Sequence, residues 1–455
     1  PEHAYSFYGA DIVTDESTTS LFSLNRREYT AKMAYFALKL RPLALKKLKE
    51  NEADKLYEEI ELPLSLCLAE MELNGFPLNG ELLSSIGESY RKKRDEIEKE
   101  IYAIAGKKFN LFSPKQIGEY LYGDLNLANG KSPGTSFDVL NSLRDRHPVI
   151  PLILEYRKYA KLVSTYIDGL LPHVKEDGKI HTYFNQALTS TGRLSSSNPN
   201  LQNISTRDPE SKEIRKAFLY PDNNIKIASF DYGQIELRVL AALANCKPYI
   251  DVFATDRDVH EETARRIFQI PDDQEVPSSY RRKAKAVNFA IIYGVTPFGL
   301  ADQIGTYPKD AAELISNFKT HYPEIENYLQ SILKEVEANG YVKTMFGRRR
   351  YLREVNDPNY AKREAARRAA LNAPVQGSAA DLIKAAMLKV DSFLKEGGYK
   401  TKMVLQIHDE LLFDVVPGEE EVLREIVVRE MEHVIGLSVP MTVECNVGKN
   451  WLEAH

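Results

Sequence analysis

The sequence predicts an α+β fold that is divided into at least two lobes. The chain has 455 residues, which is more than one hydrophobic core usually holds. Two β-prone segments, at 225–231 and 403–416, lie far apart in the sequence, and the segments around them have mainly helical patterns. We therefore expect a small sheet built from distant strands, with helical lobes inserted between them.

The first β-prone segment ends in an acidic residue. The run at 225–231 ends at Asp231, and apolar residues then recur at helical spacing, at Ile235, Val239 and Leu243. This pattern predicts that Asp231 lies at the end of a strand, beside the start of a helix.

The second β-prone segment predicts a hairpin with acids at its tip. Two apolar runs within 403–416 are separated by the polar residues His408, Asp409 and Glu410. Carboxylates at the ends of adjacent strands can share metal ions, and Mg²⁺ prefers one or two carboxylates together with substrate phosphates. Two such ions can activate an attacking hydroxyl and stabilise a leaving oxygen. Asp231 and Asp409 are therefore candidate ligands of a two-metal site.

A helix between these acidic segments carries a stripe of cations and rings. Its members follow in steps of four: Arg281, Lys285, Phe289 and Tyr293. Steps of four keep the side chains on one face of a helix, and this face turns around the helix axis by about 40° per step. Cations neutralise phosphate oxygens and rings stack on bases, so this order suits a nucleoside triphosphate. Gly294 then supplies a helix stop. The alternative is a solvated basic start that runs into a buried apolar end.

The charge of the chain is uneven. The net charge is −5 and the isoelectric point is about 6.1, which alone would not indicate a nucleic-acid-binding protein. Basic residues nevertheless cluster at 91–94, 348–353 and 362–368. One such cluster is most often a solvated face, but several beside a nucleotide motif indicate a channel lined for phosphates.

Cysteine usage and hydropathy indicate the cellular compartment in which the chain is expected. The chain has three widely separated cysteines, so neither a disulfide framework nor a CxxC metal site is indicated. No apolar run has the length of a membrane span, and no signal-peptide pattern opens the chain. We therefore expect a reducing, cytoplasmic environment and no membrane association.

Several segments match one family in order and spacing. The segments at 231–238, 281–294 and 406–410 resemble the three principal motifs of the family A DNA polymerases. Further segments are similar to other motifs of that family, including one that grips primer and template: 191–196, 198–204, 346–351 and 374–381. The resemblance implies a right-hand polymerase fold, in which a palm with an antiparallel sheet carries helical fingers and a helical thumb.

The same resemblance implies a division of the chain into domains. The expected order is a remnant of an exonuclease-like domain at 1–61, a thumb at 62–170, a first palm segment at 171–246, fingers at 247–349 and a second palm segment at 350–455.

The resemblance also implies roles for the acids. Asp231 and Asp409 would bind two Mg²⁺ ions, which Mn²⁺ can replace, and the carbonyl of Tyr232 would be a further ligand. Glu410 would be a nearby and less essential catalytic acid. The alternative for these acids is a set of carboxylates on surface turns.

The stripe on the helix would bind the incoming deoxynucleotide. Arg281 and Lys285 would contact its triphosphate, and Lys285 would also help to protonate the departing pyrophosphate. Phe289 would pack against the sugar and base, and Tyr293 would occupy the template-base position until the fingers close. The alternatives are an exposed and mildly repulsive cationic pair, and two core aromatic residues.

Three further residues are expected at the nucleotide. Glu236 matches the steric gate that leaves no room for a 2′-hydroxyl, a role compatible with that of an acid at a helix N-terminus. His260 matches a fingers histidine that touches the triphosphate, although a lone histidine is often structural. Gln234 completes the expected nucleotide-binding set.

Polar side chains from several motifs would contact the primer and the template. Side-chain donors can read minor-groove acceptors that all four base pairs share, which checks geometry without sequence preference. The expected DNA-binding residues are Arg193, Gln202, Asn203, Arg349, Gln376, Gln406 and His408.

Two positions depart from the family pattern. Gly233 stands where the family commonly carries serine, and glycine would loosen the turn beside Asp231. Met33 stands where the exonuclease-like domain has a metal-binding aspartate, and a thioether cannot replace a hard carboxylate for Mg²⁺. The earlier acidic motifs of that domain are missing from this sequence, so we expect no 3′–5′ proofreading.

The expected activity is template-directed addition of deoxynucleotides to a primer 3′-hydroxyl, with release of pyrophosphate. The expected partners are primer-template DNA and dNTPs, and the chain would act as a monomer. RNA-template copying is an alternative side activity. A catalytically silent DNA-binding or scaffold protein is an alternative of another class, which loss of either Asp231 or Asp409 would have favoured.

Overall fold

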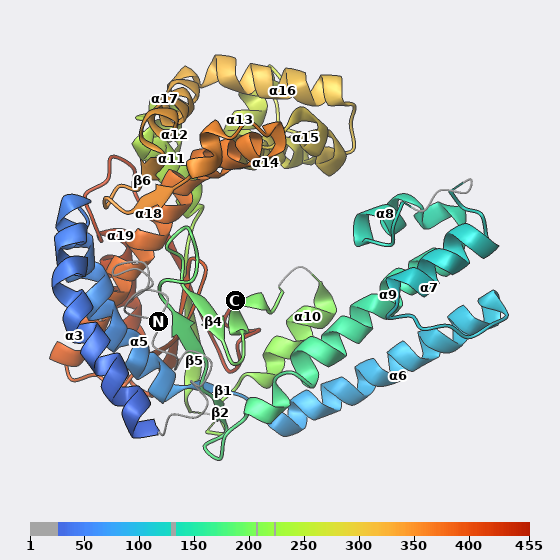
Figure 1. Cartoon of the computed structure of the whole chain (residues 1–455), viewed down its shortest axis with the longest axis horizontal. Helices are drawn as coiled ribbons and strands as arrows, with labels where there is room; N and C mark the ends of the chain where they lie inside the picture. Colours follow the sequence, from blue (N-terminus) through green and yellow to red (C-terminus); the bar gives the residue numbers. More distant parts are fainter. Residues whose placement is uncertain (1–25, 129–132, 206–207, 223) are drawn as a thin grey trace.

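The computed structural model describes residues 26–128, 133–205, 208–222 and 224–455. It has an open, C-shaped outline with a sheet near its centre (Figure 1). A helical lobe lies above the sheet, and an arm of two long helices extends to one side of it. Among the described residues, the mixture of one four-stranded sheet and three two-stranded sheets with separate helical lobes confirms the α+β prediction.

The central sheet is antiparallel and four-stranded, in the order β10-β5-β9-β8. Its strands are β5 (Lys226–Tyr232), β8 (Lys402–Ile407), β9 (Glu410–Val415) and β10 (Val443–Gly448). Asp231 on β5 lies opposite Glu410 on β9 and opposite Glu444 on β10. The predicted strand and hairpin are therefore confirmed, with one difference. Only His408 and Asp409 form the turn, because Glu410 already pairs as the first residue of β9.

Helices enclose this sheet. They are α5 (Leu62–Asn74), α11 (Ile235–Leu243), α18 (Tyr360–Glu396) and α19 (Glu420–Glu432). α5 packs against β8, α19 packs against β10, and α18 packs against the other three helices. The helix predicted from the spacing of Ile235, Val239 and Leu243 is α11.

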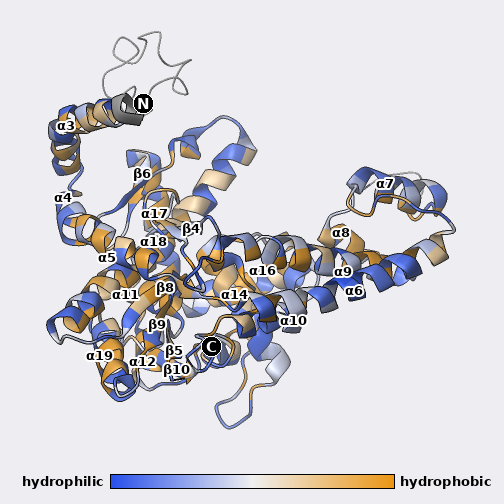
Figure 2. Ribbon diagram, turned by 90° about the horizontal axis from the view of Figure 1, so that it is seen from below, coloured by the Kyte–Doolittle hydropathy of each residue, from blue (hydrophilic) through white to orange (hydrophobic). Residues whose placement is uncertain are grey.

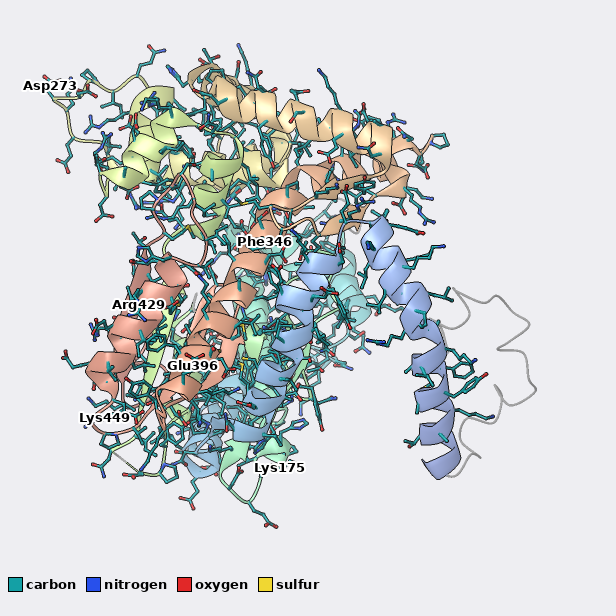
Figure 3. All side chains as sticks on the ribbon, turned by 90° about the vertical axis from the view of Figure 1, so that its left-hand side faces the viewer. Lys175, Asp273, Phe346, Glu396, Arg429 and Lys449 are labelled. Carbon is teal, nitrogen blue, oxygen red and sulfur yellow. The ribbon has the colours of Figure 1, made fainter. Side chains whose placement is uncertain are left out.

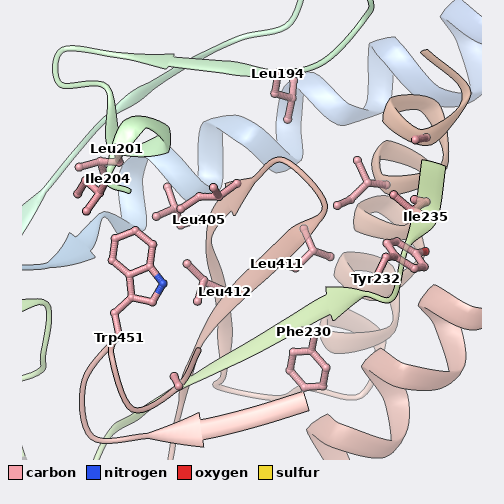
Figure 4. Close-up of a cluster of buried hydrophobic side chains, with 14 of the residues drawn as sticks. Leu194, Leu201, Ile204, Phe230, Tyr232, Ile235, Leu405, Leu411, Leu412 and Trp451 are labelled. Carbon is pink, nitrogen blue, oxygen red and sulfur yellow. The ribbon is translucent and has the colours of Figure 1, made fainter. Parts of the chain in front are cut away.

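Apolar side chains fill the interior around the sheet. Figure 4 shows Phe230 of β5 beside Leu411 and Leu412 of β9, with Trp451 near the end of the chain on the same side as Leu405. Trp451 is fully buried and packs edge-on against Phe218, with ring centroids 5.2 Å apart. Burying one large aromatic side chain stabilises a fold by about 1.5–3 kcal/mol, so this cluster fixes the end of β10 beside β5.

The helical lobe follows α11 in the sequence. It consists of α12 (Lys247–Ala254), α13 (Val259–Ile267), α14 (Ser278–Tyr293), α15 (Pro297–Ile304), α16 (Pro308–His321) and α17 (Pro323–Asn339). α13 packs along α14, and α14 packs against α18 below it. α14 is the helix predicted for the stripe. It ends where predicted, at Gly294, whose φ of 60° is left-handed.

The arm is built from α6 (Gly80–Ala105) and α9 (Val149–Lys161), which pack side by side. α7 (Pro114–Gly118) and α8 (Phe137–Ser142) lie at its outer end (Figure 1). The buried residues of α6 recur at helical spacing and include Leu83, Tyr90 and Ile97. Figure 2 shows that polar residues colour much of the arm, whereas apolar segments gather around β8, β9 and α11.

The N-terminal part of the described chain is helical. It contains α3 (Arg26–Glu50), α4 (Asp54–Leu56) and a π-helical turn, η2 (Tyr57–Glu61), that leads into α5. Figures 2 and 3 show α3 standing out from the packed body, whereas α5 lies within it. Residues 1–25 of the predicted exonuclease-like remnant lie outside the described residues. The five domain ranges stay predictions.

Short elements connect these parts. They are β1 (Phe76–Pro77), β2 (Lys179–Ile180), β3 (Tyr183–Asn185), β4 (Ser195–Ser197), α10 (Pro209–Ile214), β6 (Tyr341–Lys343) and β7 (Arg349–Tyr351). β6 and β7 form a hairpin, and Figure 3 shows Phe346 of its loop below the helical lobe. Cys67, Cys246 and Cys445 are free thiols. Within the described ranges, no helix combines the length and the apolar character that crossing a membrane requires.

Candidate active site

The two predicted aspartates lie at one end of the central sheet. Asp231 is near the end of β5, Asp409 is in the turn between β8 and β9, and the backbone N–H of Tyr232 donates to the carbonyl of Asp409 at 3.3 Å. Oδ1 of Asp231 is buried and has no hydrogen-bond partner. Burial, together with the charges of Asp409 and Glu410, raises the pKa of Asp231 to about 8. Burial also raises the pKa of Asp409 to about 6, although the charge of Arg193 opposes this shift.

These properties fit a divalent cation. Two neighbouring carboxylates that are both costly to ionise need a compensating positive charge, and carboxylate oxygens are the ligands that Mg²⁺ prefers. An unpaired buried oxygen on Asp231 is available as such a ligand. In the part of the chain that the structure describes, no three His, Cys, Asp or Glu side chains converge as a metal site. Asp231 and Asp409 are therefore the candidate donors that the structure brings near one another.

Glu410 differs from the two aspartates in its contacts. Its carboxylate accepts a hydrogen bond of 2.6 Å from the hydroxyl of Ser229, and Nδ1 of His455 lies 3.3 Å from the same oxygen. These contacts outweigh the effect of burial and lower the pKa of Glu410. Glu410 is thus held against β5 and the C-terminal segment, and Ser229 and His455 are contacts that the sequence analysis missed.

A cavity of about 260 Å³ brings together residues from distant parts of the sequence. Its lining consists of Arg193, Gln234, Ile235, Glu236, Leu237, Phe289, Tyr293, His408 and Asp409. Seven of these nine residues belong to the predicted site: Arg193, Gln234, Glu236, Phe289, Tyr293, His408 and Asp409. The start of α11, the hairpin turn and helix α14 thus line one cavity, and Asp231 and Tyr232 of β5 are not among its lining residues.

The carboxylate of Glu236 is bound from two sides within this cavity. Nη2 of Arg193 donates to one oxygen at 2.6 Å, and the hydroxyl of Tyr293 donates to the other at 2.9 Å. Burial and the charge of Glu236 raise the pKa of Tyr293, so its hydroxyl stays protonated and donates. Glu236 also lies in the first turn of α11, where the helix dipole favours an acid.

The stripe of α14 faces away from the core. Lys285 and Tyr293 are exposed and Phe289 is half-buried, so the core alternative for the aromatic pair does not hold. The two rings stack with centroids 6.4 Å apart and planes at 23°. Arg281 is not free, because its Nε donates to Oδ2 of Asp258 at 2.8 Å.

His260 lies beside this stripe on α13. Its ring centroid is 6.1 Å from that of Phe289, and its side chain is almost fully buried. Burial lowers the pKa of His260 to about 4, so the ring is neutral at pH 7. A neutral buried histidine agrees with the structural alternative, but its position next to Phe289 also suits the predicted contact with a nucleotide.

The predicted DNA-binding residues divide into two groups. Nε2 of Gln202 donates to the carbonyl of Gln406 at 3.1 Å, and Nε2 of Gln406 donates to the carbonyl of His408 at 2.6 Å. These residues reach the cavity through His408, and Arg193 lines it directly. Asn203, which follows Gln202 in the sequence, is exposed.

The second group lies on other elements. Gln376 is half-buried on α18. Arg349 lies on β7, where its Nη1 donates to Oδ1 of Asn51 at 3.1 Å. The structure therefore does not bring Arg349 to the cavity.

Gly233 has a structural explanation in this chain. A Cβ atom at this position would lie 2.8 Å from Oγ1 of Thr442, which is closer than carbon and oxygen atoms approach. The same Oγ1 accepts a hydrogen bond of 2.7 Å from Nη2 of Arg238. Gly233 does not have a positive φ. Its missing side chain leaves room for the close approach of Thr442, a contact that the sequence analysis did not foresee when it expected glycine to loosen this turn.

Comparisons with known proteins identify the family of the chain. The family model described as DNA polymerase family A matches residues 80–453. DNA polymerase I of Lactococcus lactis subsp. lactis (strain IL1403) is 43% identical over 430 residues, which cover 92% of this chain and 49% of that protein. DNA polymerase I of Bacillus subtilis (strain 168) is 42% identical over 432 residues, which cover 94% of this chain and 49% of that protein. The chain thus spans about half the length of these relatives.

A solved structure has the same fold. It is described as the POL domain of Pol1 from M. smegmatis in complex with DNA primer-template and dNTP, and it superimposes with a TM-score of 0.88. The sequence identity is 37%, and the match covers 93% of this chain and 75% of that one. This similarity confirms the predicted right-hand polymerase fold. The chain belongs to DNA polymerase family A.

Proposed function

We propose that this chain is a DNA-directed DNA polymerase. A primer 3′-hydroxyl would attack the α-phosphate of a dNTP, and pyrophosphate would leave. The observation that carries this proposal is the meeting of Asp409, Glu236 and Phe289 around one cavity of about 260 Å³. The unpaired carboxylate oxygen of Asp231 at the adjoining strand end adds to it.

Asp231, Asp409 and the carbonyl of Tyr232 are the residues that would hold metal ions. Two Mg²⁺ ions, or Mn²⁺ in their place, would when bound favour the ionised primer hydroxyl and offset the charge on the reacting phosphate oxygens. The raised pKa values of both aspartates support this role, because a divalent ion stabilises the ionised carboxylates that burial disfavours. Glu410 would support the turn from its place between Ser229 and His455.

The triphosphate would lie along the N-terminal half of α14. Arg281 and Lys285 are exposed there on one face, and the neutral His260 lies beside them. Lys285 would donate a proton to the departing pyrophosphate, since its ammonium is exposed and is the nearest stripe cation to Phe289. A guanidinium also matches two phosphate oxygens at once, which would orient the chain of phosphates for in-line attack.

The sugar and base would occupy the cavity. Glu236 forms its floor next to Phe289, so a 2′-hydroxyl would meet a carboxylate that Arg193 already holds in place. Tyr293 also lines the cavity and donates a hydrogen bond to Glu236. A template base that took the place of Tyr293 would break this contact, which would couple nucleotide entry to a movement of α14.

Primer-template DNA would be the macromolecular partner. The chain of side chains from Gln202 through Gln406 to His408 would support the primer end, and Arg193 and Gln376 would contact the minor groove. The related M. smegmatis protein is described in complex with such DNA and a dNTP. The chain would act on this substrate as a monomer, divided into the five domain ranges that the sequence predicts.

We propose that this chain has no 3′–5′ proofreading activity. Met33 lies in α3, and by the resemblance it stands where an exonuclease site would need an aspartate. A thioether sulfur is a soft ligand and does not bind Mg²⁺ in place of a carboxylate.

Primer extension tests this proposal. A labelled primer on a DNA template is incubated with Mg²⁺ and all four dNTPs, and the native chain is compared with Asp231→Asn and Asp409→Asn. Both variants are expected to lose at least about 10³-fold in rate, because each removes charge from the metal site. Glu425→Gln, on the exposed side of α19, is the matched control and should extend normally.

Additional arms separate the alternatives. A mismatched primer end should remain untrimmed, and trimming would contradict the interpretation of Met33. An RNA template measures the predicted side activity directly. Tight DNA binding by a native chain that never extends a primer would favour the silent DNA-binding alternative.

A further inference from the structure

His260 is the end of a buried chain of polar side chains in the helical lobe. The hydroxyl of Tyr249 lies 3.0 Å from Oδ1 of Asn288, and Nδ2 of Asn288 lies 2.9 Å from Nδ1 of His260. The three side chains come from α12, α14 and α13, and their exposed fractions are 0%, 1% and 2%. The mechanism above uses only the last of them.

The direction of these hydrogen bonds follows from their chemistry. An amide oxygen only accepts, so the hydroxyl of Tyr249 donates to Oδ1 of Asn288. This contact turns the amide nitrogen toward His260, and an amide nitrogen only donates. Nδ1 of His260 therefore accepts and carries the lone pair. In a neutral imidazole the proton is then on Nε2.

The ring is neutral because of its surroundings. Burial is the largest effect that lowers the pKa of His260 to about 4, and the cations Lys285 and Arg281 lower it further. Asp258 is the one group among these neighbours that raises it. A second proton on Nδ1 would also turn this nitrogen into a donor facing the donor of Asn288.

We propose that Asn288 and Tyr249 are positioning residues that hold His260 in the Nε2–H tautomer. In this tautomer His260 donates a hydrogen bond to a phosphate oxygen of the incoming nucleoside triphosphate. This inference rests on the proposed function, because it names a contact within the same nucleotide site.

The tautomer matters because a phosphate oxygen is only an acceptor. The Nε2–H form presents a donor to it, whereas the Nδ1–H form would present a lone pair and repel it. A hydrogen bond from a fixed donor to a charged acceptor is shorter and stronger than one between neutral groups. Asn288 also directly precedes Phe289 on α14, so one helix carries both the positioning residue and the nucleotide stripe.

A purely structural role explains this chain less well. Replacing buried hydrogen-bonded groups with apolar groups of the same shape is often neutral for stability. The fold would therefore not need Tyr249, Asn288 and His260 to be polar at this place. Their chain ends at the one histidine that lies beside Phe289, at 6.1 Å between ring centroids.

The first test reads the tautomer itself. The chain has nine histidines, which can be labelled with ¹⁵N, and two-bond ¹H–¹⁵N correlations distinguish the two tautomers at pH 7. His260→Gln identifies the signal of His260 by its loss. The native chain should show protonated Nε2 and unprotonated Nδ1 for this residue. A signal with protonated Nδ1 would overturn the proposal, and this measurement does not depend on polymerase activity.

The second test changes the positioning residues. Asn288→Asp replaces the donor with an acceptor and should move the proton to Nδ1, or protonate both nitrogens. Asn288→Ser retains a hydroxyl donor and should keep more of the Nε2–H form. Tyr249→Phe keeps the buried ring and removes only the hydroxyl, so it serves if the Asn288 variants do not fold.

Kinetics then connect the tautomer to the nucleotide. Tyr249→Phe should raise KM for dNTP about 3-fold and Asn288→Asp more than 10-fold, while kcat changes less than about 3-fold. An unchanged KM in a variant with a shifted tautomer would overturn the nucleotide contact. If the native chain extends no primer, the proposed function fails. The tautomer of His260 is still tested, because the spectrum does not depend on primer extension.

Discussion

The carboxylate of Asp258 binds the guanidinium of Arg281, with Nε of Arg281 2.8 Å from Oδ2 of Asp258. The other oxygen of Asp258 caps α13, because it accepts from the backbone N–H of His260 at 2.8 Å. One side chain therefore connects α13 and α14 at the point where the triphosphate would bind. Burial acts to raise the pKa of Asp258, but the hydrogen bonds from Arg281 and from the backbone outweigh it, so the pKa is lowered.

The pair of Asp258 and Arg281 has a consequence for nucleotide affinity. The carboxylate occupies the guanidinium that a phosphate would use, so it competes with the nucleotide. Asp258→Asn should lower KM for dNTP about 2- to 5-fold, because the competing charge is lost and such half-exposed pairs are worth at most about 1 kcal/mol. Steady-state extension at several dNTP concentrations measures this change.

The effect of Asp258→Asn on nucleotide affinity must be separated from an effect on the helix cap. Asparagine caps helices about as well as aspartate, so this variant should unfold at nearly the same urea concentration as the native chain. Asp258→Ala loses the cap as well and should be less stable by about 1 kcal/mol. A KM that rises in Asp258→Asn would mean that Asp258 orients Arg281 for the nucleotide and does not compete with it.

The contact between Gly233 and Thr442 predicts a coupled pair. Gly233→Ser should destabilise the fold by about 1–3 kcal/mol and slow extension, because the new Cβ would lie 2.8 Å from Oγ1 of Thr442. Thr442→Ala removes that oxygen, and the introduced serine hydroxyl can then accept from Arg238.

The double variant of Gly233 and Thr442 should recover at least half of the stability lost in Gly233→Ser, as measured by urea unfolding. Thr442→Ala alone is the control for the lost hydrogen bond with Arg238. Additive effects of the two substitutions would show that the two side chains do not compete for space.

Metal binding should offset a pH-dependent cost at Asp231. The folded-state pKa of about 8 lies above the unfolded value of about 3.8, so the folded chain binds this proton more tightly. In metal-free protein, the contribution of Asp231 to stability is therefore lost as the pH rises from about 4 to 8. Asp231→Asn cannot ionise and should be more stable than the native chain above pH 8, by up to about 6 kcal/mol.

Urea unfolding in EDTA across pH 5–9 measures this difference. Asp231→Asn and the native chain should converge toward pH 5 and diverge toward pH 8. Added Mg²⁺ should stabilise the native chain most at high pH, where its carboxylates are ionised, and should leave Asp231→Asn nearly unchanged. A difference that stays constant with pH would contradict the raised pKa of Asp231.

Sequence reasoning singled out most of the residues that line the cavity because the motifs that carry them are local. The strand that ends near Asp231, the turn at Asp409 and the stripe that ends at Gly294 are each written in a few consecutive residues. The pattern Asp258-Val-His-Glu261 is also a readable helix start, so the cap at Asp258 was predictable in principle.

Contacts between distant segments were not predictable in this way. The partner of Thr442 is Gly233, and the bond of Asp258 to Arg281 depends on how two helices pack. The place of Arg349 away from the cavity was not predictable for the same reason. A basic cluster in the sequence indicates phosphates, but the partner Asn51 is set by where the β6–β7 hairpin folds.

A buried ion network joins the N-terminal helices to α18. Nζ of Lys384 lies 2.7 Å from Oε1 of Glu61, and Nε of Arg348 donates to Oδ1 of Asp381 at 2.8 Å. Arg348 also binds Glu61, so one guanidinium connects the two carboxylates. Lys384 and Asp381 are each 0% exposed. Burial lowers the pKa of Lys384, although the charge of Glu61 opposes this shift.

Breaking this network from its acidic side should cost more than removing its lysine. Glu61→Gln leaves the ammonium of Lys384 buried without its carboxylate, and such losses cost about 3–5 kcal/mol. Lys384→Met fills a similar volume and removes the buried charge, so it should cost about 1 kcal/mol or less. Urea unfolding of both variants and of the double variant measures the coupling. The double variant should be more stable than Glu61→Gln alone, since methionine leaves no unpaired ammonium behind, and strictly additive losses would show that Glu61 and Lys384 do not depend on each other.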